Sequence, residues 1–393
     1  AIANNPKLLI ADEPTTALDV TVQQKIIALL KELQAQNGMS ILFISHDLTL
    51  ISEIAQRVLV MKDGEIVEQG TVNEVFKHPK HPYTKALINS KPKLNERLKI
   101  LPTVQNFLKN DFLPEVITKE NRQKKQEQLY AQTPLLSIKN LKKYYKIDKG
   151  WFQPHDIVKA VDDIDLNIYE GETVGLVGES GCGKTTLGRT ILNLEKPTAG
   201  ELFYKGIDIT TLKDSDWKVL RKEIQIIFQD PYASLNPRIT IGKAILEPMK
   251  VHQIHKSDKE RKLAVVELLK KVGLNETHYS RYPHEFSGGQ RQRIGIARAI
   301  ALHPKLIICD ESVSALDVSV QAQVLNLLNQ LKDEFQFTYL FISHDLAVVK
   351  YMSDQMVVMH QGKIVEKGEA DGIYEDPQNE YTKKLINSIP KGI

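Results

Sequence analysis

An α/β fold with a buried, largely parallel sheet is predicted by three features of the sequence. Two short apolar runs, Thr173–Val177 and residues 305–309, have the composition of buried parallel strands. The first run is followed by a glycine-rich string and then by a helical pattern over residues 186–194, while the second ends in two acidic residues. Polar motifs at the carboxyl ends of strands are typical of the ligand sites of α/β sheets.

Composition limits the classes of protein that remain possible. The 393 residues, 42% of them apolar and 26% charged, fit a globular protein of two or more domains. A net charge of +3 does not indicate nucleic-acid binding. No apolar stretch approaches the roughly 20 residues that cross a bilayer, and no signal sequence is visible, so work at a membrane would require docking onto another subunit. Two cysteines, Cys182 and Cys309, do not make a disulfide framework and indicate a reducing compartment.

The chain also repeats itself at an offset of 298 residues, which is too long for a solenoid and indicates a duplicated domain. Nearly half of the positions in residues 1–92 are identical in the second copy. Repeated pairs include Asp12 and Asp310, Glu13 and Glu311, Asp19 and Asp317, His46 and His344, Gly64 and Gly362, and Tyr83 and Tyr381. The first copy begins where the second is already in mid-domain, so we expect that an N-terminal part is missing from this chain.

The glycine-rich string from Gly178 to Thr185 matches G-x-x-x-x-G-K-[ST] at every fixed position. Glycines let backbone N–H groups approach phosphate oxygens, and the following helix N-terminus adds partial positive charge. Lys184 would reach the outer phosphates and Thr185 would bind Mg²⁺. The alternative, a simple tight turn, does not account for Lys-Thr between a strand and a helix. The predicted nucleotide contacts here are Gly178, Glu179, Ser180, Gly181, Cys182, Gly183, Lys184, Thr185 and Thr186.

Asp310 and Glu311 end the second predicted strand. Two carboxylates at such a place are costly to bury without a cation or a water molecule to act on. Asp310 suits the shell of Mg²⁺, and Glu311 suits a general base for the attacking water. The alternative is an Asp-Glu turn that caps the next helix, and the phosphate loop favours the catalytic interpretation.

The string from Phe286 to Arg293, Phe-Ser-Gly-Gly-Gln-Arg-Gln-Arg, precedes an apolar helical pattern and starts with Ser287 as a good N-cap. Here the sequence resembles the ATP-binding cassette (ABC) ATPases, whose signature is close to this string. The resemblance implies an α/β P-loop NTPase of ABC type, with a RecA-like core, an antiparallel β subdomain and an α-helical subdomain. It covers residues 135–393 as a complete nucleotide-binding domain and residues 1–92 as the C-terminal part of a first one, with a linker at 93–134.

The resemblance also implies roles for single residues. Tyr145, rather than Tyr144, would stack on adenine, and Gln229 would sense Mg²⁺ and the water. His344 would contact the γ-phosphate, although a lone histidine after a strand is more often structural. The implied catalytic set is Glu311, His344, Gln229 and Lys184, and the metal set is Thr185, Gln229 and Asp310. Ser287, Gly288, Gly289, Gln290 and Asp317 would act across the interface with an opposite cassette.

Two departures from the family pattern are mild. Ser312 stands where a proline is usual after the acid pair, and Phe286 replaces a leucine. Cys182 is interpreted as a small residue tolerated by the loop. The alternative is a reactive thiol activated by the helix N-terminus, whose alkylation would inhibit hydrolysis and against which ATP would protect.

Three strings resemble the ATPase subunits of dipeptide and oligopeptide importers, and the two copies resemble the fused ATPase of the microcin C and oligopeptide type. The strings are residues 227–238, residues 281–290, and the repeated ends at 81–87 and 380–385. The resemblance implies ATP and Mg²⁺ as cofactors and peripheral attachment to the cytoplasmic face of the plasma membrane. It implies transmembrane permease subunits, a second cassette from a homodimer or a partner chain, and indirectly a periplasmic or extracellular peptide-binding protein, but no nucleic acid. Coupling to the permease would run through residues 229–238, and no iron–sulfur cluster is expected.

The first copy keeps Asp12, Glu13, Asp19 and His46 but has no phosphate loop. We expect its strand at residues 7–11 to lie at an open sheet edge and this part to be marginally stable. The linker is expected to hold one helix, and its basic run is interpreted as a solvated face rather than a binding patch. Two other functions stay open, namely a non-transport ABC ATPase of translation or DNA repair, and an inactive remnant of a broken gene.

Overall fold

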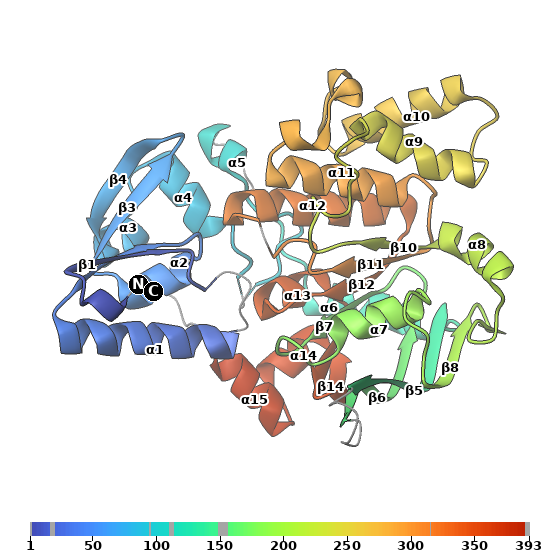
Figure 1. The fold of residues 1–393 in the computed structure, drawn as a ribbon, viewed down its shortest axis with the longest axis horizontal. Helices are drawn as coiled ribbons and strands as arrows, with labels where there is room; N and C mark the ends of the chain where they lie inside the picture. Colours follow the sequence, from blue (N-terminus) through green and yellow to red (C-terminus); the bar gives the residue numbers. More distant parts are fainter. Residues whose placement is uncertain are drawn as a thin grey trace. The chain divides into compact units, whose positions relative to one another are not determined.

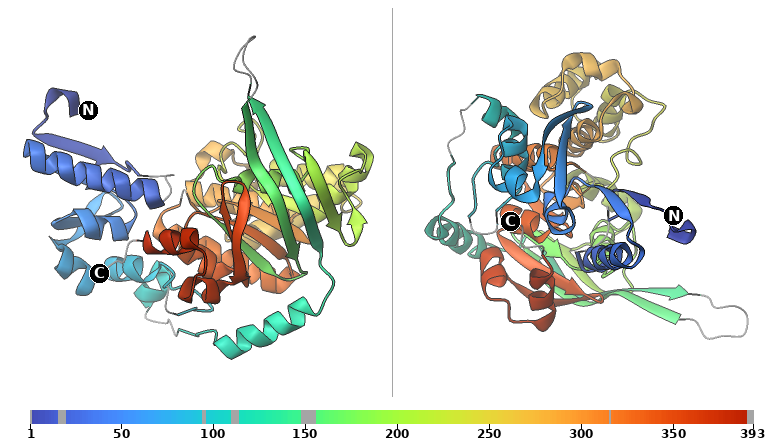
Figure 2. Two further views of the ribbon diagram at one scale, coloured as in Figure 1. Left: turned by 90° about the horizontal axis from the view of Figure 1, so that it is seen from below. Right: turned by 90° about the vertical axis from the view of Figure 1, so that its left-hand side faces the viewer.

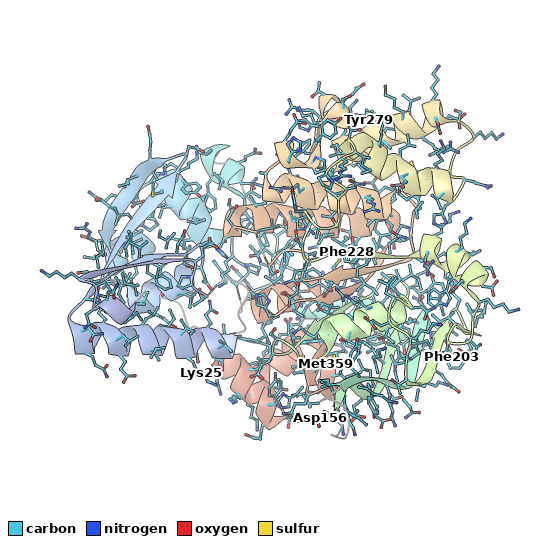
Figure 3. All side chains as sticks on the ribbon, in the orientation of Figure 1. Lys25, Asp156, Phe203, Phe228, Tyr279 and Met359 are labelled. Carbon is cyan, nitrogen blue, oxygen red and sulfur yellow. The ribbon has the colours of Figure 1, made fainter. Side chains whose placement is uncertain are left out.

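A computed structural model describes residues 2–15, 20–93, 96–109, 114–147, 156–314 and 316–389 (Figures 1 to 3). Two compact units divide these residues. The smaller unit contains residues 1–117, 316–326 and 383–393, and the larger one contains residues 118–315 and 327–382. None of the helices in the described ranges is long and apolar enough to span a bilayer.

The core of the larger unit is a six-stranded sheet whose order is β10-β11-β12-β7-β13-β14. All neighbours are parallel except β13 and β14. Every residue of β7, β11 and β12 is buried, which confirms the two predicted buried parallel strands. The strands are β7 (Thr173–Val177), β10 (Ile224–Ile227), β11 (Leu306–Asp310), β12 (Thr338–Ile342), β13 (Gln355–His360) and β14 (Lys363–Glu369).

Helix α7 (Lys184–Ile191) packs against this sheet through Leu187 and Ile191, which join Ile308 and Ile342 in one apolar core. The helix starts two residues before the predicted range of 186–194 and ends three residues before its end. It stops because Asn193 has a left-handed φ of 52°, which breaks the helical hydrogen-bond pattern. The other helices are α12 (Val318–Phe335), α13 (Leu346–Met352), α14 (Ala370–Glu375) and α15 (Glu380–Asn387), and the division between units passes through α12 and α15.

Two further layers complete the larger unit and confirm the predicted fold class. An antiparallel sheet of order β6-β5-β8-β9 contains β5 (Leu136–Ile147), β6 (Asp156–Ile168), β8 (Ala199–Tyr204) and β9 (Ile207–Asp208). A helical part gathers around α9 and α10 (Figure 1). Its elements are α9 (Ile241–Val251), α10 (Asp258–Lys271), the 3₁₀ turns Glu276–Ser280 and Pro283–Glu285, and α11 (Gly288–Ile300). Helix α8 (Asp214–Glu223) instead places Trp217 in the apolar core of the sheets.

The smaller unit repeats part of this architecture. Its strands β1 and β2 pair in parallel, and the hairpin of β3 and β4 has its register shift at Val60/Met61, the counterpart of Val358/Met359 in β13. The elements are Ile2–Asn4, β1 (Leu8–Asp12), α1 (Val20–Asn37), β2 (Ser40–Ile44), α2 (Leu48–Ile54), β3 (Arg57–Lys62), β4 (Glu65–Thr71), α3 (Val72–Lys77), α4 (Pro82–Asn89) and α5 (Val104–Lys109).

Strand β1 has one neighbour only among the described strands, which confirms the expected open edge. Leu8 and Ile10 are 54% and 61% exposed, whereas their counterparts Leu306 and Ile308 are fully buried. The same apolar side chains thus form a core in one copy and an exposed sheet face in the other.

The stretch expected to hold one helix holds two, α5 and α6 (Lys119–Tyr130). Helix α6 belongs to the larger unit. Its basic residues do not form a freely solvated face, because Arg122 pairs with Glu369 and Lys125 pairs with Asp354 at 2.6 and 2.7 Å. Few apolar residues occur in α6, so sequence patterning alone gives no sign of this packing.

Candidate active site

The phosphate loop follows β7 and is shaped by three glycines. Gly178, Gly181 and Gly183 have φ angles of 152°, 78° and 110°, which side chains rarely tolerate. A Cβ at Gly183 would lie 1.9 Å from the carbonyl oxygen of Ala160. One at Gly178 would lie 2.2 Å from that of Met359, which Figure 3 labels. Backbone therefore packs directly on backbone, and α7 starts without a side-chain cap, as an anion-binding helix start requires.

Lys184 is 5% exposed and lies over this loop. Its Nζ donates to the carbonyl oxygens of Gly178 and Glu179 at 2.8 and 2.9 Å. The next residue, Thr185, donates its hydroxyl to Asp310 Oδ1 at 3.0 Å. A cation and a hydroxyl thus lie together at the start of α7, where a phosphate and its metal ion would be bound.

Asp310 and Glu311 are held differently although they are adjacent. Burial raises the pKa of Asp310 above its usual value. Glu311 has a left-handed φ of 46°, and its backbone N–H donates to Ile342 O at 3.0 Å. This conformation separates the two carboxylates, so that one meets Thr185 and the other meets the residues of the neighbouring strand ends.

Glu311 is the centre of a three-residue cluster. Gln229 Nε2 donates to Glu311 Oε2 at 2.7 Å, and His344 Nδ1 lies 3.5 Å from Glu311 Oε1. The hydrogen bond and the charge of His344 hold the pKa of Glu311 below its usual value. Burial alone would lower the pKa of His344, but Glu311 outweighs it and the pKa is raised. An ionised carboxylate beside an imidazole and an amide can bind and polarise a water molecule.

The residues fit a nucleotide with Mg²⁺. The described residues contain no group of three or more His, Cys, Asp or Glu side chains suited to hold a metal ion by themselves. Mg²⁺ normally takes only one or two protein ligands and completes its octahedron with phosphates and water. Thr185 and the buried Asp310 carboxylate supply such a partial set, and the glycine loop leaves room for the phosphates.

The two candidates for stacking on adenine, Tyr144 and Tyr145 of β5, make different contacts. Burial raises the pKa of Tyr145, which lies near Thr186 of α7 and Glu195, and Lys143 Nζ lies over its ring at 4.8 Å from the centroid. Tyr144 instead donates its hydroxyl to Asp162, and its backbone N–H donates to Thr198 at 2.9 Å. Tyr145 therefore lies by the start of α7, whereas the Tyr144 hydroxyl is held by Asp162; the stacking of Tyr145 on adenine stays a prediction.

Two of the predicted interface residues, Ser287 and Asp317, cap helices. Ser287 caps α11, because its hydroxyl accepts from Gln290 N at 3.3 Å and its own N–H donates to Gln290 Oε1 at 3.1 Å. This confirms the predicted N-cap. A Cβ at Gly288 would meet nothing within 4 Å, so its glycine is not required by packing inside this chain. Asp317 caps the first turn of α12 by accepting from Val320 N at 3.1 Å.

Cys182 is 6% exposed, and burial raises the pKa of its thiol despite the nearby Lys184. A raised pKa means less thiolate at neutral pH and hence a less reactive cysteine. This favours the interpretation of Cys182 as a small loop residue over that of an activated thiol.

The first copy has the same acid and histidine geometry without a phosphate loop. Glu13 has a φ of 45°, and His46 Nδ1 lies 3.1 Å from Glu13 Oε1. These two side chains are 45% and 31% exposed, against 16% and 22% for Glu311 and His344. Asp19 lies outside the described residues.

Sequence reasoning missed two groups that contact the phosphate loop. Gly362, in the turn between β13 and β14, donates its N–H to Cys182 O at 3.0 Å. Tyr381 of α15 accepts from Glu179 N through its hydroxyl at 3.1 Å. Both residues recur in the first copy, as Gly64 and Tyr83, but no local motif connects them with a phosphate site.

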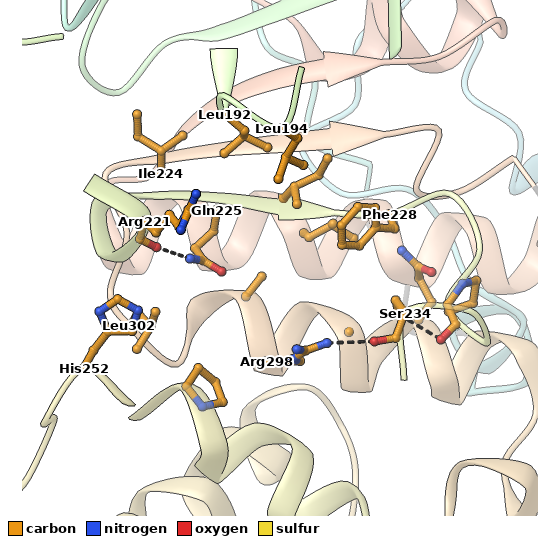
Figure 4. A pocket seen from close by; sticks show the side chains of 17 residues that line it. Leu192, Leu194, Arg221, Ile224, Gln225, Phe228, Ser234, His252, Arg298 and Leu302 are labelled. Carbon is orange, nitrogen blue, oxygen red and sulfur yellow. Dashed lines mark hydrogen bonds between the residues drawn. The ribbon is translucent and has the colours of Figure 1, made fainter. Parts of the chain in front are cut away.

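A cavity of about 280 Å³ lies beside β10, α9 and α11 (Figure 4). Its lining is mixed, with apolar Leu192, Phe228 and Leu302 and with Arg298, whose guanidinium donates to Ser234 O at 2.7 Å. Phe228 is 37% exposed and directly precedes Gln229. One lining residue of this cavity thus directly precedes Gln229, which contacts Glu311.

Comparison with known proteins identifies the family. The family described as "ABC transporter" matches residues 161–314, and the "Oligopeptide/dipeptide transporter, C-terminal region" matches twice, at 67–110 and 365–392. A solved ATP-binding cassette, a dimer bound to ADP and phosphate in a post-hydrolysis state, is 31% identical with a TM-score of 0.54. That match covers 98% of the solved chain and 60% of this one. The chain belongs to the ABC transporter family of ATP-binding cassettes.

Further relatives of this ABC chain are named as import ATP-binding proteins or as part of an ABC transporter complex. It is 46% identical over 396 residues to the glutathione import ATP-binding proteins GsiA of Shigella flexneri and Escherichia coli strain K12. These matches cover 99% of the chain, which spans 62% of the length of each relative. The cbiO1 structure from Clostridium perfringens, part of the cbiONQ ABC transporter complex, is 25% identical with a TM-score of 0.54 over 66% of this chain and 97% of that one. The repeated match of the C-terminal region supports the internal duplication found in the sequence.

Proposed function

We propose that this chain binds ATP with Mg²⁺ and hydrolyses it to energise an ABC importer of peptides or peptide-like molecules such as glutathione. The observation that carries the proposal is the cluster in which Gln229 and His344 meet Glu311, next to the Thr185–Asp310 pair. The family and the GsiA relatives support it independently. On this proposal residues 135–393 form a complete nucleotide-binding domain, and residues 1–92 are the C-terminal part of another.

Hydrolysis on this proposal depends on positioning and charge. Loop amides and Lys184 hold the phosphates, and Thr185, Asp310 and Gln229 face the metal, which when bound would neutralise phosphate charge. Glu311, kept ionised by His344, orients the attacking water and accepts its proton. Tyr145 offers its ring to the adenine.

A second cassette completes the site. Ser287, Gly288, Gly289, Gln290 and Asp317 would face it across a head-to-tail interface, supplied by another copy of the chain or by a partner chain. The open space around Gly288 supports this, because an approaching backbone needs a position without a side chain. Dimeric cassettes among the solved structures support it further.

A permease subunit would dock on the cavity beside β10. Phe228 lines this cavity and is 37% exposed, and Tyr232, three residues after Gln229, is 47% exposed, so both offer apolar contacts near Gln229. Docking there would place the chain at the cytoplasmic face of the membrane. A peptide-binding protein outside the membrane would act through the permease and not through this chain.

The internal repeat provides a matched control for the first experiment. Mg²⁺-dependent ATP hydrolysis would be measured for the 393-residue chain and for Glu311→Gln and Glu13→Gln. We expect Glu311→Gln to reduce the rate at least about 100-fold while ATP still binds, because the amide cannot accept the proton. Glu13→Gln should leave the rate within about twofold of the parent, since no phosphate loop accompanies Glu13 in its copy. Equal rates in all three proteins would disprove the catalytic role of Glu311.

A further inference from the structure

Helix α15 contacts the phosphate loop through Tyr381. Tyr381, on α15, accepts a hydrogen bond from the backbone N–H of Glu179 at 3.1 Å. Its ring lies against His360, the last residue of β13, with ring centroids 3.9 Å apart and planes inclined by 31°. The start of α15 is itself fixed, because Tyr381 N donates to Asn379 Oδ1 at 2.9 Å.

Glu179 is a position where the loop needs support. It follows Gly178, and Gly181 lies two residues further on, so flexible residues flank it on both sides. Its carbonyl oxygen accepts from Lys184 Nζ at 2.9 Å. A lysine that reaches for phosphate must give up this bond. The bond from Glu179 N to Tyr381 does not involve Lys184, so it can persist when Lys184 moves.

The first copy contains a tyrosine at the position that corresponds to Tyr381. Tyr83 is the counterpart of Tyr381, and Lys62, the counterpart of His360, lies over its ring at 5.6 Å from the centroid. Both tyrosines lie within the two stretches that match the oligopeptide/dipeptide transporter C-terminal region. Tyr83 lies outside the unit that contains residues 178–185, so a change at Tyr83 leaves that phosphate loop intact.

We propose that Tyr381 is a positioning residue of the nucleotide site, which holds the Glu179 end of the phosphate loop so that the following amides face the phosphates. The proposal rests on the ATP binding proposed above. It gives the C-terminal region a part in nucleotide affinity in addition to any contact with other subunits.

The test removes only the hydroxyl. Tyr381→Phe keeps the ring on His360, and Tyr83→Phe in the same chain is the matched control. In the nucleotide-free chain, the Glu179 amide should exchange with deuterated solvent faster in Tyr381→Phe and unchanged in Tyr83→Phe. Titration with ATP and with ADP should show about two- to tenfold weaker binding in Tyr381→Phe, as the loss of one neutral hydrogen bond predicts. The KM for ATP should rise by a similar factor, with kcat within about twofold.

Each other outcome has a defined meaning. Unchanged exchange at Glu179 together with unchanged ATP and ADP affinity in Tyr381→Phe would overturn the proposal. A lower thermal midpoint with faster exchange throughout the larger unit would also overturn it, because Tyr381 would then be merely structural. Lys184→Ala separates this from the proposed function. If that variant binds ATP as the parent does, the ATP site itself is wrong, whereas its loss of binding leaves the site standing whatever Tyr381→Phe does.

Discussion

At the scale of the residue, the left-handed backbone of Glu311 results from its place at the end of β11 and does not require a nucleotide. Glu311 and Glu13 have φ angles of 46° and 45°, and each donates its N–H to the neighbouring strand, at Ile342 O and Ile44 O. Left-handed conformations cost a non-glycine residue roughly 1–3 kcal/mol. The first copy keeps this strain without a phosphate loop, so the parallel strand pairing is sufficient to impose it.

Glycines of the site fall into two classes that mutation can separate. Gly183→Ala would place a Cβ against Ala160 O and require a φ of 110°, so we expect ATP binding to be lost and the free energy of unfolding to fall by about 2 kcal/mol or more. Gly288→Ala meets nothing within 4 Å and should leave both unchanged. Thermal unfolding and ATP titration measure the two effects. Equal loss of stability in both variants would contradict this distinction.

Glu172 predicts a pH dependence of stability. It is fully buried, accepts from Tyr130 OH and Tyr169 N, and burial raises its pKa from 4.5 to about 7. The folded state therefore holds the proton more tightly than the unfolded state, and stability is full below pH 4.5 and lost as pH rises through 7. The loss attributable to Glu172 is about 3 kcal/mol.

Glu172→Gln keeps a neutral acceptor for Tyr130 and removes the titration. The midpoint of chemical denaturation should fall between pH 5 and 8 in the parent and stay flatter in the variant. Burial lowers the pKa of Lys332 to about 8, so Lys332 titrates mainly above this pH range. Parallel pH profiles for the two proteins would refute the assignment to Glu172.

At the scale of the element, α6 shows how a helix without an apolar face is held. Arg122 is 11% exposed and pairs with Glu369 and with the buried Asp371. Lys125 pairs with Asp354, which also accepts from Lys332 at 3.1 Å. Ion pairs of this kind depend on partners far along the chain, so the charge pattern of α6 could not distinguish a solvated face from a docked one.

Two ion pairs of α6 differ in burial, so breaking them should change the free energy of unfolding by different amounts. Arg122→Ala removes one of the two cations beside the buried Asp371, whose other partner is Lys350 at 3.5 Å, and we expect about 1–3 kcal/mol of destabilisation. Lys119 pairs with Glu375 at 2.8 Å where both side chains are more than half exposed, so Lys119→Ala should give no measurable change. Denaturant titration in low salt measures both. A similar effect of the two changes would show that α6 contributes little through its buried pair.

At the scale of the whole molecule, the proposed site is incomplete without a second cassette. If the cassettes at residues 135–393 of two chains pair head to tail, the ATPase activity per chain should rise with protein concentration rather than stay constant. Gly288→Ala should reduce that rise, because it fills space which a partner's phosphate would approach, without changing the affinity of the isolated chain for ATP. Activity per chain that is constant over a hundredfold range of concentration would show that pairing between copies does not supply the second half.

The sequence by itself determined the parts of this protein whose chemistry is local. The phosphate loop, the acid pair after β11 and the Ser287 cap each need particular residues at fixed short spacings, because a tight turn or a helix start involves only neighbouring backbone groups. The identical residues at positions 298 apart likewise revealed the duplication and predicted the open edge of β1.

Only the tertiary structure decided which of these parts meet. Gln229 reaches Glu311 across 82 residues because the sheet places β10 beside β11. Tyr381 reaches Glu179 across 202 residues because β7 lies beside β13, against whose last residue, His360, the Tyr381 ring packs. This strand order depends on long crossover connections, which leave no periodic trace in the local sequence. Leu8 and Leu306, placed alike in two matching strings, are exposed in one copy and buried in the other, because β11 has a strand on each side and β1 has one neighbour among the described strands.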